Sequence, residues 1–299
     1  MARTRSVIHG LMAKHILEGR GIPTFYYGQH YMGSLEAIMA SVSFWLFGIS
    51  PFALQLVPLC WSLSLIVLMF YLVGSISNAR AGLLAAALTA VPPASLLVWS
   101  SKARGGFIEV SVIGVAAFLV LVRWLRRDPD ETGYPVALGA ILGLGWWVNN
   151  QILYFMFPIG LFGLIHTVAR PRSARYWRRI MRIVLCGAVA FFVGGAPSWL
   201  YNLKHGFPSS KMFAIADWSS FKAHVQGFLW IALPMITGAQ RFWQKTAVFP
   251  FAKSIAFCLY VVPVGLLVLA RLPRLLRVGL GFIDRQRPIE ILTVFTIGC

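Results

Sequence analysis

The chain has 299 residues, of which 58% are hydrophobic and only 12% are charged, and its mean hydropathy is +0.73. Soluble domains have roughly 45–50% apolar and about 25% charged residues, so the composition excludes an ordinary soluble globular protein. The apolar residues occur in runs of about 20, long enough to cross about 30 Å of hydrocarbon as helices. We therefore predict an all-α, polytopic helical membrane protein with about seven full spans.

The predicted spans lie near residues 52–73, 82–98, 107–122, 136–148, 152–168, 183–200 and 254–270, and an incomplete span begins near 289. Their loops alternate between two sides of the membrane. The loops of one side are 75–81, 123–134, 169–182 and 271–288, and they hold 15 of the 27 basic residues, all arginines. The positive-inside rule assigns these loops to the cytoplasm. The net charge of +18 then reflects topology and a membrane-lipid partner, and it requires no nucleic acid.

Residues 1–51 are the first outer segment. Five apolar residues recur at helical spacing, with His9 among the polar residues between them: Ile8, Leu11, Met12, Ile16 and Leu17. Gly19 to Pro23 end this helix. A second apolar helix over residues 34–47 is too short to span. Both helices are predicted to lie at the outer interface.

The connection between these two helices is rich in rings and hydrogen-bonding groups. It contains Tyr26, Tyr27, Gln29, His30 and Tyr31, interleaved with glycines. Two interpretations remain open: an interfacial aromatic belt, or a site for a polar, ring-shaped ligand.

The outer loop after the second span carries Lys102 and Arg104, and Glu109 lies one turn into the next span. A carboxyl group within an apolar helix is costly and is a functional hypothesis by default. Arg104 could meet Glu109 as a structural ion pair. Alternatively, the two cations suit a phosphate or diphosphate, which Arg binds bidentately and Lys as a point charge.

Two further outer regions follow. Asn149, Asn150 and Gln151 form a polar turn that is either a simple loop or part of a ligand site. The loop 201–253 includes an aromatic stretch, 221–243, predicted as an interfacial helix. The chain thus divides into an outer segment 1–51, a six-span core 52–200, an outer loop 201–253, and a last part 254–299 with one span, a basic inner loop and a truncated span.

The histidine and cysteine spacings match no metal-binding or cofactor motif. Cys60, Cys186 and Cys258 lie within apolar runs, and Cys299 ends the chain. We therefore predict no metal and no cofactor.

Several motifs together resemble a known family. They are Gly10-Leu-Met-Ala13, His15-Ile-Leu17, Gly19, Tyr27-Gly-Gln29, Tyr31-Met-Gly-Ser-Leu-Glu36, Phe47-Gly48, Lys102-Ala-Arg-Gly-Gly106 with Glu109, Gly145-Trp-Trp147, and Pro197 with Tyr201-Asn202. The chain resembles bacterial membrane glycosyltransferases of the GT-C class, similar to protein O-mannosyltransferases and lipid A aminoarabinose transferases (family 39-like). The resemblance covers residues 6–205 and is strongest in the first 110.

The resemblance implies transfer of a sugar from a polyprenyl-phosphate carrier to an acceptor hydroxyl at the outer face of the bacterial inner membrane. The polyprenyl-phosphate sugar is then a donor substrate and not a cofactor. The residues expected to bind substrate are Tyr27, Gln29, His30, Tyr31, Glu36, Lys102, Arg104, Asn149, Asn150, Tyr201 and Asn202. The alternatives are a lipid or sugar transporter and a non-catalytic membrane scaffold.

The chain departs from the family pattern at its beginning. The family has an Asp-Glu pair four to five residues before the glycine that corresponds to Gly10, whereas this chain has Arg5 and Ser6. Neither side chain can take an acceptor proton at neutral pH. We expect a fragment that lacks the first span and the C-terminal part and is inactive alone, with Glu36 and Glu109 as the fallback catalytic candidates.

Overall fold

The described part of the chain is helical throughout. The computed structural model describes residues 2–92, 94–103, 105–127, 131–168, 173–209, 218–241 and 246–263, and also residues 265, 266, 269, 270 and 272. Within these ranges there are no strands, and the β-type pairings are isolated bridges. The prediction of an all-α protein is confirmed.

The helices follow one another with short connections. They are α1 (Ala2–Leu17), α2 (Leu35–Phe47), α3 (Pro51–Ile76), α4 (Ala79–Ala90), α5 (Ala94–Ser101), α6 (Phe107–Leu125), α7 (Gly133–Val148), α8 (Leu153–Val168), α9 (Ala174–Gly194), α10 (Ala196–His205), α11 (Trp218–Gly227), α12 (Leu233–Ile236) and α13 (Ala252–Ala256). A 3-10 turn, Asn150–Ile152, precedes α8, and π-helical turns, Phe228–Ala232 and Phe257–Val261, follow α11 and α13.

Side-chain caps fix where several helices begin. Ser50 accepts a hydrogen bond from the amide of Ala53 at the start of α3, where Pro51 is the first helical residue. Asn78 and Ser173 cap α4 and α9 in the same way. Each cap satisfies an amide that the helix itself leaves unpaired.

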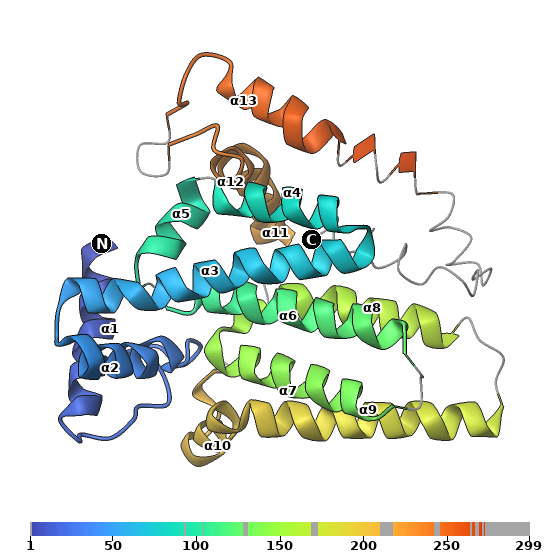
Figure 1. Cartoon of the computed structure of the whole chain (residues 1–299), viewed down its shortest axis with the longest axis horizontal. Coiled ribbons are helices and arrows are strands. Elements are labelled where there is room, and N and C mark those ends of the chain that lie inside the picture. The colour runs from blue at the N-terminus through green and yellow to red at the C-terminus, as the bar shows by residue number, and fades with distance from the viewer. Residues whose placement is uncertain are drawn as a thin grey trace.

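Helices α3, α6, α7, α8 and α9 lie side by side (Figure 1). Helices α3 and α6 run in the same direction because α4 and α5 make the return between them, and from α6 to α9 each helix reverses the direction of the one before. Helix α6 is central: most of its residues are buried, and they form the main apolar core with α3, α7 and α8. Helices α7 and α9 approach through glycines. A Cβ atom on Gly139 would lie 2.1 Å from the carbonyl oxygen of Gly187, and one on Gly143 would lie 2.0 Å from that of Phe191. Such close backbone approach is typical of helix pairs in membranes.

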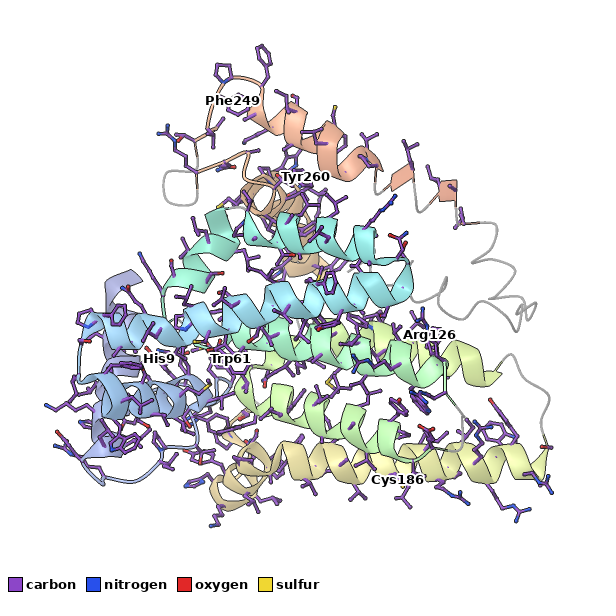
Figure 2. All side chains as sticks on the ribbon, in the orientation of Figure 1. His9, Trp61, Arg126, Cys186, Phe249 and Tyr260 are labelled. Carbon is purple, nitrogen blue, oxygen red and sulfur yellow. The ribbon has the colours of Figure 1, made fainter. Side chains whose placement is uncertain are left out.

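The two ends of this bundle differ in chemistry. The turns after α3 and α6 lie together at one end, where the guanidinium of Arg126 donates to the carbonyl oxygen of Ser75. The arginines at the start of α9 lie toward the same end, whereas α1, α2 and α10 surround the other (Figure 1). Among the described residues, the arginines that follow α3 and α6 and begin α9 therefore lie away from the motif-bearing segments, and Figure 2 shows Arg126 and His9 at these opposite ends of the bundle.

In the described part of the chain, two helices are long and apolar enough to cross a membrane. They are Pro51–Ile76 and Phe107–Leu125, and Ala174–Gly194 with Ala196–His205 makes a third if this pair, bent by 72°, is one span. Large apolar side chains are exposed on the bundle surface, including Leu83, Leu88, Phe157 and Val193. An apolar surface of this kind indicates contact with lipid or another apolar partner.

Several sequence predictions need correction. The single span near 82–98 is instead two helices, α4 and α5, because the Pro-Pro step at residues 92–93 interrupts it. The helix expected over 221–243 is continuous from residue 218 to residue 236, with a π-helical turn between α11 and α12, and it ends before Gly238. The incomplete span near 289 and the basic loop 273–288 lie outside the described residues.

The face assigned to α1 is correct only in part, because Ile8, Met12 and Ile16 lie in a buried cluster but the two leucines and His9 do not lie as predicted. His9, Met12 and Ala13 are fully buried, whereas Leu11 and Leu17 are more than 40% exposed. The side of α1 that is buried is the side that packs against α2 and the loop before it. This side includes His9, whereas the two leucines lie on the exposed side. A partner for this buried imidazole is therefore required.

Candidate functional site

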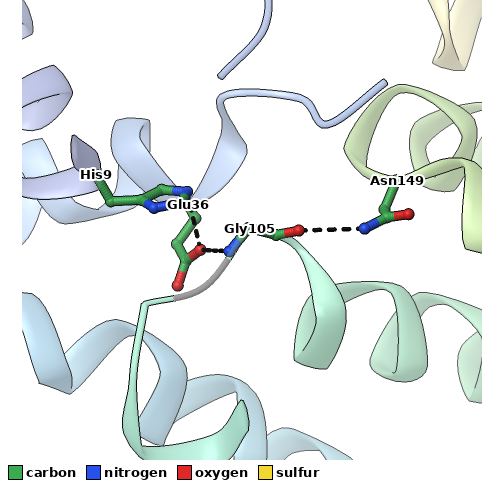
Figure 3. Close-up of polar contacts among 4 residues, drawn as sticks. All are labelled: His9, Glu36, Gly105 and Asn149. Atoms are coloured by element: carbon green, nitrogen blue, oxygen red, sulfur yellow. Dashed lines mark hydrogen bonds and ion pairs between the residues drawn. The ribbon is translucent and has the colours of Figure 1, made fainter. Parts of the chain in front are cut away.

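A buried polar network joins four segments that are distant in sequence. His9 of α1 places its Nε2 atom 3.2 Å from Oε2 of Glu36 in α2. The same oxygen accepts a hydrogen bond of 2.7 Å from the amide of Gly105 in the α5–α6 loop. The carbonyl oxygen of Gly105 in turn accepts from the side-chain amide of Asn149, 3.2 Å away at the end of α7 (Figure 3).

All three side chains of this network are removed from solvent: His9 is 0% exposed, and Glu36 and Asn149 are each 2% exposed. Asn149 is fixed further by the amide of Gln151, which donates to its Oδ1 atom. A charge-assisted hydrogen bond is among the stronger polar contacts in a protein. The network therefore holds α1, α2, the α5–α6 loop and the end of α7 in one arrangement.

Two glycines allow the α5–α6 loop to enter this crowded site. Gly105 has φ +99°, and a Cβ atom there would lie 2.7 Å from the sulfur of Met32. Gly106 has φ +79°, and its Cβ would lie 2.9 Å from the carbonyl oxygen of Val148. Both positions need left-handed backbone and close approach, which only glycine combines without strain. The Gly-Gly step thus presents a backbone amide to Glu36.

Glu109, in the first turn of α6, adds a second buried carboxyl group. It is 0% exposed, and neither of its carboxyl oxygens has a hydrogen-bond partner among the described residues. Glu36 lies close enough for the two carboxyl groups to repel each other electrostatically. Burying a carboxyl group without a partner is costly, and such costs are concentrated at functional sites. The structure therefore singles out Glu109.

A short hairpin connects this network to the aromatic residues predicted from sequence. Its ends pair where Phe25 faces Gly33, and the amide of Gly33 donates to the carbonyl oxygen of Val148. The indole of Trp147 donates to the carbonyl oxygen of Thr24, 2.9 Å away. A Cβ on Gly33 would lie 2.5 Å from the carbonyl oxygen of Trp147, so this hairpin rests directly on the end of α7.

A group of rings lies at the other side of the hairpin. The ring of Tyr201 in α10 is stacked between His30 and His205, with centroids 5.6 Å and 4.0 Å away. The ring of Phe25 meets Tyr201 edge-on at 5.0 Å. The hydroxyl of Ser209 donates to the carbonyl oxygen of His30, which ties the hairpin to the segment after α10. Aromatic contacts of this kind favour a defined arrangement of the rings.

Asn202 holds the segment after α10 in place. Its Oδ1 atom accepts from the amide of Ser209 at 3.1 Å, and its Nδ2 atom donates to the carbonyl oxygen of Ser198 at 2.9 Å. Asn202 is only 3% exposed, and both ends of its side-chain amide form hydrogen bonds within the protein. It therefore fixes the backbone that carries the ring group and does not face solvent.

The structure thus brings the predicted site residues into two groups. Glu36, Glu109 and Asn149 belong to the buried network, and His30, Tyr201 and Asn202 belong to the ring group. Tyr27 lies apart, with its hydroxyl 3.0 Å from Nδ1 of His15.

The remaining predicted residues have less specific surroundings. Tyr31 packs against the small core of Met12, Tyr26 and Met32. The side-chain oxygen of Gln29 is buried and has no hydrogen-bond partner in the described part, whereas Lys102 and Asn150 are partly exposed. Arg104 lies outside the described residues, as do the side chains of Arg5 and Ser6.

His9 and the backbone of Gly105 are the members of the buried network that the sequence analysis did not identify. The available signal was the spacing of His9 with Met12, Ala13 and Ile16, which places the imidazole on one helical stripe with small and apolar residues. In the part of the chain that the structure describes, no group of three or more His, Cys, Asp or Glu side chains is arranged to hold a metal ion.

Comparisons with known proteins identify no relative: no family model matches the chain, and neither a curated protein nor a solved structure resembles it significantly.

Proposed function

We propose that this chain transfers a sugar from a polyprenyl-phosphate carrier to an acceptor hydroxyl at the outer face of a bacterial inner membrane. This proposal replaces the inactivity expected from sequence, because it assigns the base to Glu109, one of the two fallback carboxyl groups. The observation that carries the proposal is the buried network of His9, Glu36, Gly105 and Asn149 beside Glu109. Segments that carry the GT-C resemblance converge there, which is expected if they build one site. The network lies at the end of the bundle away from the arginine-rich loops, which the positive-inside rule assigns to the cytoplasm.

In the proposed reaction the two buried carboxyl groups, Glu109 and Glu36, have different roles because their surroundings differ. Glu109, whose oxygens have no partner in the described part, takes the proton of the acceptor hydroxyl. The acceptor oxygen bonds to the anomeric carbon as the bond from that carbon to the phosphate oxygen breaks. The bonding pair leaves with polyprenyl phosphate. Glu36, which is already engaged by Gly105 and His9, is a positioning residue for the α5–α6 loop.

Lys102 and Arg104 are proposed to bind the carrier phosphate, since both belong to the loop that Glu36 holds. We expect Lys102→Ala to weaken binding of undecaprenyl phosphate by roughly 10- to 150-fold, because a hydrogen bond to a charged group contributes about 1.5–3 kcal/mol. The measurement is titration of the detergent-solubilised chain with this lipid. The matched control is Lys204→Ala, an exposed lysine on α10. Equal affinity in Lys102→Ala and the unchanged chain would contradict the proposed phosphate site.

The proposal includes seven spans, with the site outside and the arginine-rich loops inside. We expect single cysteines at two exposed positions, Lys204→Cys and Glu131→Cys, to differ in labelling when the four native cysteines are replaced. In intact cells an impermeant maleimide should modify the cysteine at position 204, whereas the one at 131 should react only after the membrane is opened. The reverse pattern would place the candidate site in the cytoplasm and overturn the orientation.

One observation favours a transporter as the second candidate. The apolar stretch 82–98 is two helices, α4 and α5, and broken helices line substrate sites in many transporters. Sealed vesicles containing the chain distinguish the two functions. A glycosyltransferase releases free polyprenyl phosphate from a polyprenyl-phosphate sugar, whereas a transporter moves its substrate across the membrane without breaking that bond.

A further inference from the structure

One face of α9 changes from basic to apolar along its length. Arg175, Arg178 and Arg182 are separated by three and four residues, so they share one side of the helix, and all three are exposed. The same spacing continues through three exposed apolar side chains, Leu185, Val189 and Phe192. A helix that passes from the headgroup layer into hydrocarbon has this pattern.

The basic part of this face extends beyond the neighbouring helix. Gly187 of α9 lies beside the carbonyl oxygen of Pro135, near the start of α7. Arg182 precedes Gly187 by five residues, which is about 7 Å along the axis of α9. Arg175 precedes it by about 18 Å. In Figure 1 the N-terminal part of α9 accordingly projects past the end of α7. The three guanidinium groups therefore lie where the bundle ends.

No carboxylate of the described residues neutralises these arginines. The ion pairs among the described residues are His9 with Glu36, Lys14 with Glu18, and Arg20 with Glu18, and all of them lie in the N-terminal segment. Further cations, Arg123, Arg126 and Arg127, occupy the end of α6 at the same end of the bundle. Glu131, just before α7, also lies at this end, but it forms no ion pair among the described residues, and the arginines around it outnumber it. The described surface is thus cationic and lies next to an exposed apolar stripe.

We propose that Arg175, Arg178 and Arg182 form a binding site for the headgroups of anionic phospholipids in the cytoplasmic leaflet. Arginine binds phosphate oxygens with a planar fork of donors, and the stripe of Leu185, Val189 and Phe192 below it suits acyl chains. The occupant therefore has an anionic phosphate joined to a hydrocarbon tail. Trp177, 43% exposed on the same turns, adds a ring suited to the headgroup layer. The inference does not depend on the proposed sugar transfer.

The experiment measures lipid preference in the purified full chain. The chain is equilibrated in detergent with equal amounts of phosphatidylglycerol and phosphatidylcholine, and the retained lipids are counted by native mass spectrometry. We expect retained phosphatidylglycerol to predominate. The triple variant Arg175→Gln, Arg178→Gln, Arg182→Gln should lower this preference by about 100-fold, since each basic residue near a membrane contributes about fivefold.

The matched control removes three exposed lysines elsewhere in the chain: Lys204→Gln, Lys222→Gln, Lys253→Gln. It has the same loss of charge and should keep the preference, and circular dichroism should show that both variants stay helical. Equal retention of the two lipids by the unchanged chain would overturn the site, as would a similar loss in both variants. Displacement of the lipid by inorganic phosphate, at matched ionic strength, would identify a free-anion site instead and overturn the lipid proposal.

Discussion

Replacing Glu109 with glutamine is expected to lower sugar transfer by about 10²- to 10⁴-fold, the usual contribution of a general base. The amide is nearly the same size as the carboxyl group but cannot accept the proton of the acceptor hydroxyl. Glu109 has no hydrogen-bond partner among the described residues, so the substitution breaks no such contact there. Turnover is measured as release of polyprenyl phosphate, with a polyprenyl-phosphate hexose and a polyprenyl-phosphate pentose tested as donors.

The matched control for this prediction is Glu18→Gln, the same chemical change at a partly exposed carboxylate that pairs with Lys14 and Arg20. It should leave turnover unchanged. Binding of undecaprenyl phosphate should be equal in both variants, because the proposed phosphate ligands are untouched. Full turnover by Glu109→Gln would exclude Glu109 as the base. Loss of carrier binding together with turnover would instead indicate a structural role.

The long helices could be predicted from sequence because their signal is local. The apolar runs 52–73 and 107–122 became α3 (Pro51–Ile76) and α6 (Phe107–Leu125), and the short helix over 34–47 became α2 (Leu35–Phe47). In each case a turn residue or proline marks the boundary, and hydrophobicity over one window is sufficient. The number of spans could not be read as directly, because a Pro-Pro step divided one run and α7 and α8 are only 16 residues each.

The candidate site was predicted only in part because its contacts are not local. Glu36 was named because it ends one of the motifs that resemble the family, but its two partners, Gly105 and His9, are 69 and 27 residues away. One partner is a backbone amide, which has no side-chain signature in a sequence. The imidazole of His9 was assigned to a polar face because its own residue type is polar. Its burial follows from the packing of α1 against α2, which only the fold shows.

Removing Glu36 altogether is expected to destabilise the chain more than any other single truncation at this site. Glu36→Ala removes the acceptor of the Gly105 amide and the carboxyl oxygen that lies 3.2 Å from Nε2 of His9. Leaving a buried hydrogen-bonding group without its partner in this way costs about 1–3 kcal/mol. The measurement is chemical unfolding of the purified chain in detergent, followed by helical circular dichroism.

Two control variants show whether the loss of stability comes from the network or from the loss of any carboxylate. Glu18→Ala removes a surface carboxylate and should cost less than about 1 kcal/mol. Glu36→Gln keeps a side-chain oxygen for the amide of Gly105, so it should retain more stability than Glu36→Ala.

A double-mutant cycle with His9→Ala tests whether the network acts as a unit. If His9 and Glu36 stabilise each other, the double variant loses less stability than the sum of the two single losses, by about 0.5–3 kcal/mol. The lipid titration adds a readout that packing alone would not change: Glu36→Gln should bind undecaprenyl phosphate more weakly than Glu18→Gln does. Additive losses with unchanged lipid affinity would mean that Glu36 neither couples to His9 nor positions the α5–α6 loop.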